Sequence, residues 1–129
     1  MKRDFDVYIY PINEPIKSHL KSVVEYMEKH GSPTIRVYEY DSGIYYALEG
    51  SHRLAAAKIL NMVPVLLVMD LEDSVEDFVD VDRWDMLDNM VGYNEDDFDP
   101  DRHRTVEDIV NYVQENGPRP IKFEEVHLL

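Results

Sequence analysis

The residues best suited to chemistry stand together at Gly50-Ser51-His52-Arg53, where an alanine-rich run begins. Glycine lets a ligand approach the backbone closely, and a serine hydroxyl is able to cap a helix. The guanidinium of Arg53 and the imidazole of His52 add hydrogen-bond donors that suit phosphate oxygens. Because a helix N-terminus presents unpaired N–H groups and the positive end of the helix dipole, this corner is suited to bind an anion.

The same residues also have an ordinary structural explanation. Gly50-Ser51 before a helix is common capping chemistry. Arg53 is able to pair with an acidic residue of 70–101, and His52 is able to serve as a structural histidine. The residue types alone leave both interpretations open.

The corner lies between an expected β-hairpin and an expected helix. Residues 34–40 and 44–48 are rich in β-branched and aromatic residues, and Asp41-Ser42-Gly43 between them indicates a tight turn. Residues 52–61 are apolar nearly all round and predict a buried helix, which begins directly at the corner. Residues 64–69 then predict a strand.

Two further elements come before the hairpin. Residues 6–10 alternate apolar and aromatic side chains and predict a strand, and residues 16–29 place apolar side chains at helical spacing. Asn13-Glu14-Pro15 indicates the helix start, because asparagine caps helices and proline suits the first turn. The order over residues 6–69 therefore predicts an α+β fold, a small mixed sheet with packed helices.

Charge divides the chain near residue 70. Residues 1–70 hold 8 Lys and Arg against 9 Asp and Glu, whereas residues 71–129 hold 5 against 18, which gives the chain a net charge of -14. Residues 70–101 contain 14 acids and one base, Arg83. We therefore expect a core at 1–70 and an acidic helical C-terminal extension at 71–129, packed together as one compact domain.

The extension has its own predicted elements. Helices are expected near 74–80 and 82–91, with a loop to about residue 104. Thr105-Val106-Glu107-Asp108 resembles a capping box and predicts a final helix at 106–116. Residues 121–123 and 126–129 are expected to form an extended tail that pairs with the edge of the sheet.

Composition excludes several classes of protein. The chain has no cysteine, which rules out disulfides, thiolate metal sites and a cysteine nucleophile. A net charge of -14 disfavours a nucleic-acid partner without excluding one, because such binders need a basic face. No apolar run approaches the ~18 residues of a membrane span, and the N-terminus carries acids where a signal peptide is apolar, so we expect a cytoplasmic protein with no membrane partner.

No metal site is expected from the sequence. The histidines outside the corner show no spacing typical of transition-metal ligands. Asp97, Asp99, Asp101 and Asp108 imitate the spacing of a calcium-binding EF-hand loop. However, Arg102 occupies the position where that loop needs glycine, so a solvated acidic loop is the expected structure.

The order of strand, Gly50-Ser51-His52-Arg53, alanine-rich helix and Val63-Pro64-Val65 strand resembles the ParB/sulfiredoxin superfamily over residues 6–69. Members carry G-E-R-R or G-C-H-R at this turn. Residues 10–15, Tyr-Pro-Ile-Asn-Glu-Pro, resemble the family's entry into its first helix, and Lys21 falls near a lysine that sulfiredoxins place there. The resemblance implies that Gly50, Ser51, His52, Arg53 and Lys21 contact the phosphates of a nucleotide.

Two activities of that superfamily are not expected here. Ser51 stands where sulfiredoxin has its reactive cysteine, and a serine hydroxyl cannot form thiol-linked intermediates. The chain is therefore not a working sulfiredoxin. ParB reads DNA through regions downstream of this unit, and here the downstream half is short and acidic, so a partition protein is not expected either.

Glu14 and Glu49 are the candidate catalytic residues. Either carboxylate is able to hold Mg2+ against a triphosphate or to accept a proton from an attacking hydroxyl. The alternative is that Glu49 only ends a strand and Glu14 only caps a helix. The expected function is nucleotide-phosphate binding, with ATP or CTP and Mg2+ as the ligands, in a phosphotransferase or NTPase.

Two other functions stay open. One is a noncatalytic interaction or regulatory module whose acidic C-terminal surface binds a basic protein. The other, less favoured, is a ParB-like nuclease, which would need a basic groove that the sequence does not show. The preferred base, any phosphoryl acceptor and the oligomeric state are not determined by the sequence.

Overall fold

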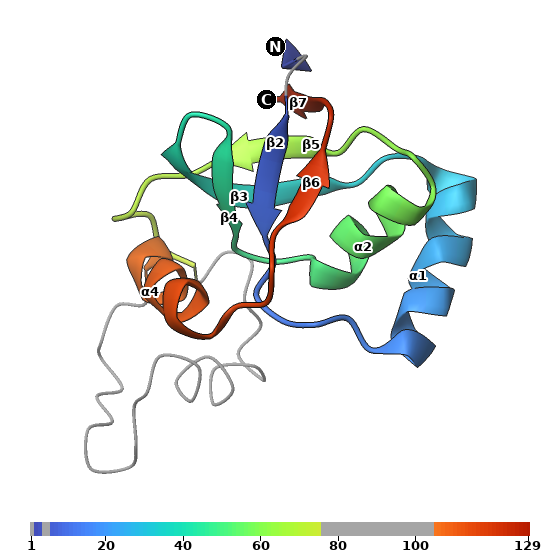
Figure 1. Cartoon of the computed structure of the whole chain (residues 1–129), viewed down its shortest axis with the longest axis horizontal. Coiled ribbons are helices and arrows are strands. Elements are labelled where there is room, and N and C mark those ends of the chain that lie inside the picture. Colours follow the sequence, from blue (N-terminus) through green and yellow to red (C-terminus); the bar gives the residue numbers. More distant parts are fainter. Residues whose placement is uncertain (1, 4–5, 76–104) are drawn as a thin grey trace.

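The computed structural model describes residues 2–3, 6–75 and 105–129 (Figure 1). Helices and strands alternate along the first part of the chain, and two more strands follow the last helix. In chain order the elements are β1 (Lys2–Arg3), β2 (Val7–Tyr10), α1 (Lys17–His30), β3 (Thr34–Asp41), β4 (Ile44–Ala47), α2 (Ser51–Ile59), β5 (Val65–Val68), α4 (Val106–Asn116), β6 (Ile121–Phe123) and β7 (Val126–Leu128).

The strands of the described residues form one mixed, seven-stranded sheet in the order β1-β7-β5-β3-β4-β2-β6. The pairs β2–β4, β3–β5 and β5–β7 are parallel, and β3–β4, β2–β6 and β1–β7 are antiparallel. This confirms the predicted α+β class with a small mixed sheet.

The sheet is strongly curled. β6 and β7 lie near opposite ends of the strand order, yet only Glu124 and Glu125 separate them in the chain. Three Cα–Cα steps join Phe123 to Val126, so these two strands approach within about 11 Å of each other. Figure 1 shows the chain turning sharply between them.

Helices cover both faces of the sheet. One core packs apolar residues of α1 and α2 against the inward-facing residues of the strands, with Met27, Ile35, Leu54 and Leu66 among its fully or almost fully buried members. A second core packs α4 against the other face (Figure 1). The corner at residues 50–53, where α2 begins, is called the α2 corner from here on. It lies on the face of the sheet that α1 also covers.

Several predicted boundaries are confirmed, and one is wrong. The final helix spans Val106–Asn116 as expected, and the Thr105 N–H donates to the Asp108 carboxylate at 3.1 Å, as in the predicted capping box. The prediction that Asn13 caps the first helix is wrong, because α1 begins at Lys17 with Ile16 at the N-cap. The physical reason lies in contacts of residues 11–16 with α2, described below.

The C-terminal strands join the same sheet as the N-terminal ones. β6 pairs with β2, and β7 pairs with β5 and β1. The sheet thus takes strands from both sides of the predicted boundary near residue 70.

The helices expected at 74–80 and 82–91 lie outside the described residues, apart from Ser74 and Val75. None of the helices in the described part of the chain is both long enough and apolar enough to span a bilayer.

Candidate functional site

The start of α2 has an unusual backbone. Gly50 is its N-cap residue and adopts the left-handed conformation, with φ 75° and ψ 33°. A Cβ atom at this position would lie 2.6 Å from Cδ1 of Ile35 and 3.0 Å from the Arg53 guanidinium. Glycine is therefore required here both for its conformation and for the close packing of α2 on β3.

The first turn of α2 leaves its backbone donors open. The first intrahelical hydrogen bond runs from the Leu54 N–H to the Gly50 carbonyl at 2.9 Å. No side chain caps the helix, and no acid occurs in its first turn. The N–H groups of Ser51, His52 and Arg53 consequently have no acceptor within the described residues. The expectation that Ser51 caps α2 is wrong, because Ser51 is the first residue of the helix itself.

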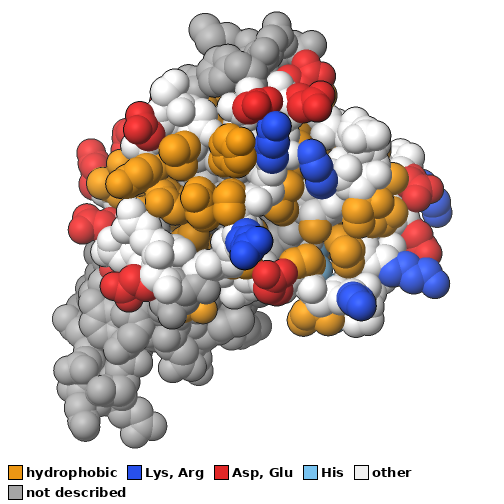
Figure 2. All heavy atoms as spheres, in the orientation of Figure 1, with side chains coloured by type: hydrophobic (Ala, Val, Ile, Leu, Met, Phe, Trp, Pro, Cys, Tyr) orange, Lys and Arg blue, Asp and Glu red, His pale blue; other side chains and the backbone are white. Residues whose placement is uncertain are grey.

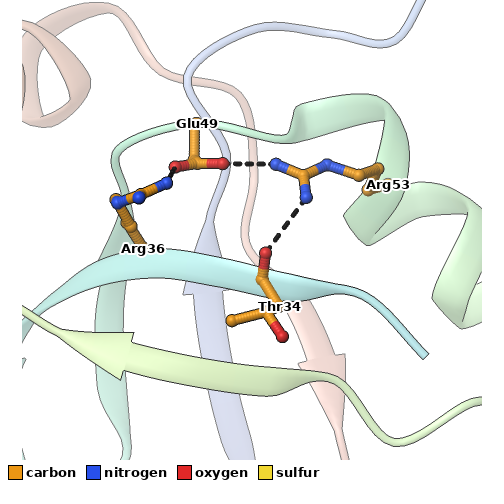
Figure 3. Close-up of polar contacts among 4 residues, drawn as sticks. All are labelled: Thr34, Arg36, Glu49 and Arg53. Atoms are coloured by element: carbon orange, nitrogen blue, oxygen red, sulfur yellow. Dashed lines mark hydrogen bonds and ion pairs between the residues drawn. The ribbon is translucent and has the colours of Figure 1, made fainter. Parts of the chain in front are cut away.

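Arg53 is held beside this helix start by two contacts (Figure 3). One guanidinium nitrogen pairs with the Glu49 carboxylate, and another donates to the Thr34 carbonyl at 3.0 Å. The second oxygen of Glu49 accepts from Arg36 of β3 at 2.7 Å. Arg53 therefore pairs with Glu49. Most of the acids of residues 70–101, the alternative partners named from the sequence, lie outside the described residues.

The three charged side chains carry one net positive charge and remain in contact with solvent. The side chains of Arg36 and Arg53 are 37% and 38% exposed, and that of Glu49 is 20% exposed. Solvent screening at such sites makes each ion pair worth only about 0.5 kcal/mol. Their main effect is to position Arg53, because each carboxylate oxygen of Glu49 holds one guanidinium.

Ser51 and His52 anchor the segment that leads into α1. The Ser51 Oγ accepts from the Asn13 N–H at 3.3 Å, and His52 Nε2 accepts from the Ile16 N–H at 2.9 Å. Accepting through Nε2 requires a neutral imidazole with its hydrogen on Nδ1. His52 thus acts as an acceptor at this nitrogen, where the sequence suggested a donor. These two contacts explain why Asn13 is not a helix cap.

Glu14 and Lys21 come from the segment before α1 and from α1 itself. Glu14 is exposed and lies between the two anchored residues of the segment, Asn13 and Ile16. Lys21 is exposed on α1, and no hydrogen bond or ion pair of the described residues joins it to α2. The nearer contact from α1 is His19, whose ring centroid is 5.6 Å from that of His52.

Sequence reasoning missed Arg36 as a member of this site. Its signal was present in the hairpin register, because the Leu48 N–H donates to the Arg36 carbonyl at 2.9 Å and so places Glu49 next to Arg36. A count from the turn at 41–43 sets Glu49 opposite Arg36, one position from the observed register, because the hairpin has a register shift between Glu39 and Asp41. Such a count would have placed the carboxylate beside β3.

No cluster of three or more metal-ligating side chains occurs among the described residues. The EF-hand-like positions at 97, 99 and 101 lie outside them. Asp108, the last of that series, is described and takes part in the capping box of α4. What the α2 corner offers instead is a set of donors: three open N–H groups and a guanidinium, which is chemistry that suits an oxyanion.

Comparisons with protein-family models, with curated proteins and with solved structures find no match for this chain. The resemblance to the ParB/sulfiredoxin superfamily stays a prediction from the residues of the turn.

Proposed function

We propose that the α2 corner binds the phosphates of a nucleoside di- or triphosphate, with Gly50, Ser51, His52 and Arg53 as its contacts. The proposed ligands are ATP or CTP with Mg2+, and the proposed activity is phosphotransfer or nucleotide hydrolysis. The observation that carries this proposal is the uncapped start of α2, whose N–H groups stand beside a positioned guanidinium.

The contrast with α4 supports the proposal. α4 starts with a capping box and has Glu107 and Asp108 in its first turn, so its N-terminal donors and dipole are already balanced by acids. α2 has neither feature. A bound phosphate would supply the acceptors that the first N–H groups of α2 lack.

The roles of the side chains differ. Arg53 is already oriented by Glu49 and Thr34, so a phosphate would meet a guanidinium that loses little conformational freedom on binding. Ser51 and His52 contribute mainly backbone N–H groups, because their side chains hold residues 13 and 16. Glu14 is the better placed of the two proposed catalytic carboxylates, since it is exposed, whereas Glu49 already binds two guanidinium groups.

Calorimetric titration with ATP, CTP, ADP and GTP, each with Mg2+, tests the proposal. Micromolar binding of at least one nucleotide that is lost in Arg53→Ala is the expected result. Lys29→Ala is the matched control, because it also removes one exposed cation but lies about 15 Å further along α1 than His19. A melting curve for each variant separates lost binding from lost folding.

No detectable binding of any of the four nucleotides by the folded protein would overturn the proposal. The noncatalytic interaction module would then become the leading function. Equal loss of binding in Lys29→Ala and Arg53→Ala would also contradict the proposed site, because it would show that binding depends on overall charge alone.

A further inference from the structure

A cluster of tyrosines lies on the face of the sheet that carries α4. Side chains two residues apart on a strand share a face, which groups Tyr8 with Tyr10 on β2 and Tyr38 with Tyr40 on β3. β4 lies between these strands and supplies Tyr46. Its ring centroid is 5.2 Å from that of Tyr10 and 5.3 Å from that of Tyr40.

α4 covers only part of this cluster. Tyr10, Tyr38 and Tyr46 belong to the core beneath α4, whereas Tyr8 and Tyr40 are 40% and 54% exposed. We call Tyr8, Tyr40 and Ile44, the β4 partner of Tyr8, the tyrosine face. Figure 2 shows hydrophobic side chains gathered over this part of the sheet, at the upper left of the view.

The tyrosine face has acidic surroundings. Asp41 is exposed directly after Tyr40. The other two acids between Val37 and Ser51 do not face the rings, because Glu39 alternates to the opposite face of β3 and Glu49 binds Arg36 and Arg53. Figure 2 shows acidic side chains along the outer margin of the hydrophobic area. Lys122 lies beside Tyr8 on the other margin, but its charge is paired with Asp6 at 3.3 Å.

Charge decides which kind of partner suits this surface. Two copies of a chain with a net charge of -14 repel each other, which opposes a homodimer through this face. Nucleic acid is opposed for the same reason. A cationic peptide is attracted by the acidic surroundings, and guanidinium groups in particular stack favourably on tyrosine rings.

We propose that the tyrosine face binds an arginine-containing basic segment of another protein. Tyr8 and Tyr40 provide the ring faces, and the acidic hairpin around Asp41 attracts the positive charge. Tyrosine is among the residues that most often dominate protein interfaces, because it buries a large rigid ring at a small entropic cost. This surface is formed by the sheet and not by the α2 corner, so the proposal is independent of nucleotide binding.

Fluorescence anisotropy with labelled hexa-arginine and hexa-lysine tests this proposal at about 0.1 M salt. The two probes have equal charge, so long-range attraction by acids treats them alike, and the tyrosine variants separate ring stacking from the bidentate bonds that only arginine makes to carboxylates. We expect hexa-arginine to bind more tightly, and Tyr8→Ser/Tyr40→Ser to weaken its binding about five- to thirtyfold, as expected for two exposed cation–π contacts. Hexa-lysine binding should change much less.

Two control variants make the result specific. Tyr26→Ser removes a tyrosine that is 62% exposed but lies on α1, where it stacks on His30, and it should bind hexa-arginine as the unmodified chain does. Tyr8→Phe/Tyr40→Phe keeps both rings and should also retain binding. Equal affinity for both probes, or equal binding by the Tyr8→Ser/Tyr40→Ser variant with its fold intact, would overturn the proposal. So would a homodimer that this variant abolishes.

Discussion

The packing of Gly50 against Ile35 predicts a measurable coupling between these two residues. Gly50→Ala places a residue with a Cβ atom in the left-handed region, which costs about 1–2 kcal/mol. The new Cβ atom also meets Ile35 Cδ1 at 2.6 Å, and Ile35 is fully buried, so it cannot move aside freely. Overpacking of this kind costs about 1–3 kcal/mol, which brings the expected total to about 2–5 kcal/mol.

Ile35→Val removes the Cδ1 atom that the new Cβ would meet. This change alone should cost about 0.5–1.5 kcal/mol. In the Ile35→Val background, Gly50→Ala should then cost its conformational part and whatever the exposed Arg53 guanidinium, 3.0 Å from the new Cβ atom, loses by shifting. The double-mutant cycle should show a favourable coupling of about 1–3 kcal/mol from the lost contact with Ile35. Urea unfolding followed by circular dichroism measures all four free energies of unfolding.

Gly31→Ala is the matched control for this cycle. Gly31 also has a positive φ of 89°, but a Cβ atom there would have no neighbour within 4 Å. Its cost should therefore be the same in the unmodified chain and in the Ile35→Val background, within about 0.5 kcal/mol. Additive effects of Gly50→Ala and Ile35→Val would refute the argument that α2 approaches β3 too closely for any residue but glycine.

Three further predictions concern the polar contacts. Glu49→Gln should lower the free energy of unfolding by about 0.5–1 kcal/mol, with a smaller effect in high salt, as urea unfolding at two salt concentrations would measure. The 15N shifts of the His52 ring should show a protonated Nδ1 and an unprotonated Nε2 at neutral pH, and a reversed pattern would contradict the bond from the Ile16 N–H. Asp6 raises the pKa of Lys122, chiefly through a hydrogen bond, so this pair should stabilise the fold below the ordinary lysine pKa and cease to do so as pH rises through the raised one. Asp6→Asn should therefore be less stable than the unmodified chain at neutral pH and should match it at high pH, which melting curves across this range would test.

Local sequence patterns predicted most of the elements. The 3.6-residue periodicity predicted the helix before the hairpin, and the nearly uniform apolar run at 52–61 predicted the helix after it. Thr105 with Asp108 marked the start of α4. All of these signals are contained within a few neighbouring residues. The predicted start of α1 was wrong for the opposite reason. The observed start of α1 depends on the contacts of Asn13 with Ser51 and of Ile16 with His52, which are distant in the chain. These tertiary contacts overrode the local capping signal of Asn13.

The candidate site was predicted only in part. The run 50–53 is contiguous, so any fold places these residues together, and the helix start follows from glycine and the alanine-rich run. The side-chain partners were not predictable from the run itself. Arg36 reaches Glu49 through the register of the hairpin, and Arg53 reaches Thr34 because α2 packs on β3. Which donors stay open for a ligand is thus decided by tertiary contacts.

The most direct test of phosphate binding at the α2 corner is an amide NMR titration with ATP and with CTP in the presence of Mg2+. We expect the largest shifts at the N–H groups of Ser51, His52 and Arg53, with little change at the capped start of α4, and we expect these shifts to vanish in Arg53→Ala. Unchanged amides at 51–53 under saturating nucleotide, or shifts that centre on another helix start, would contradict the proposal.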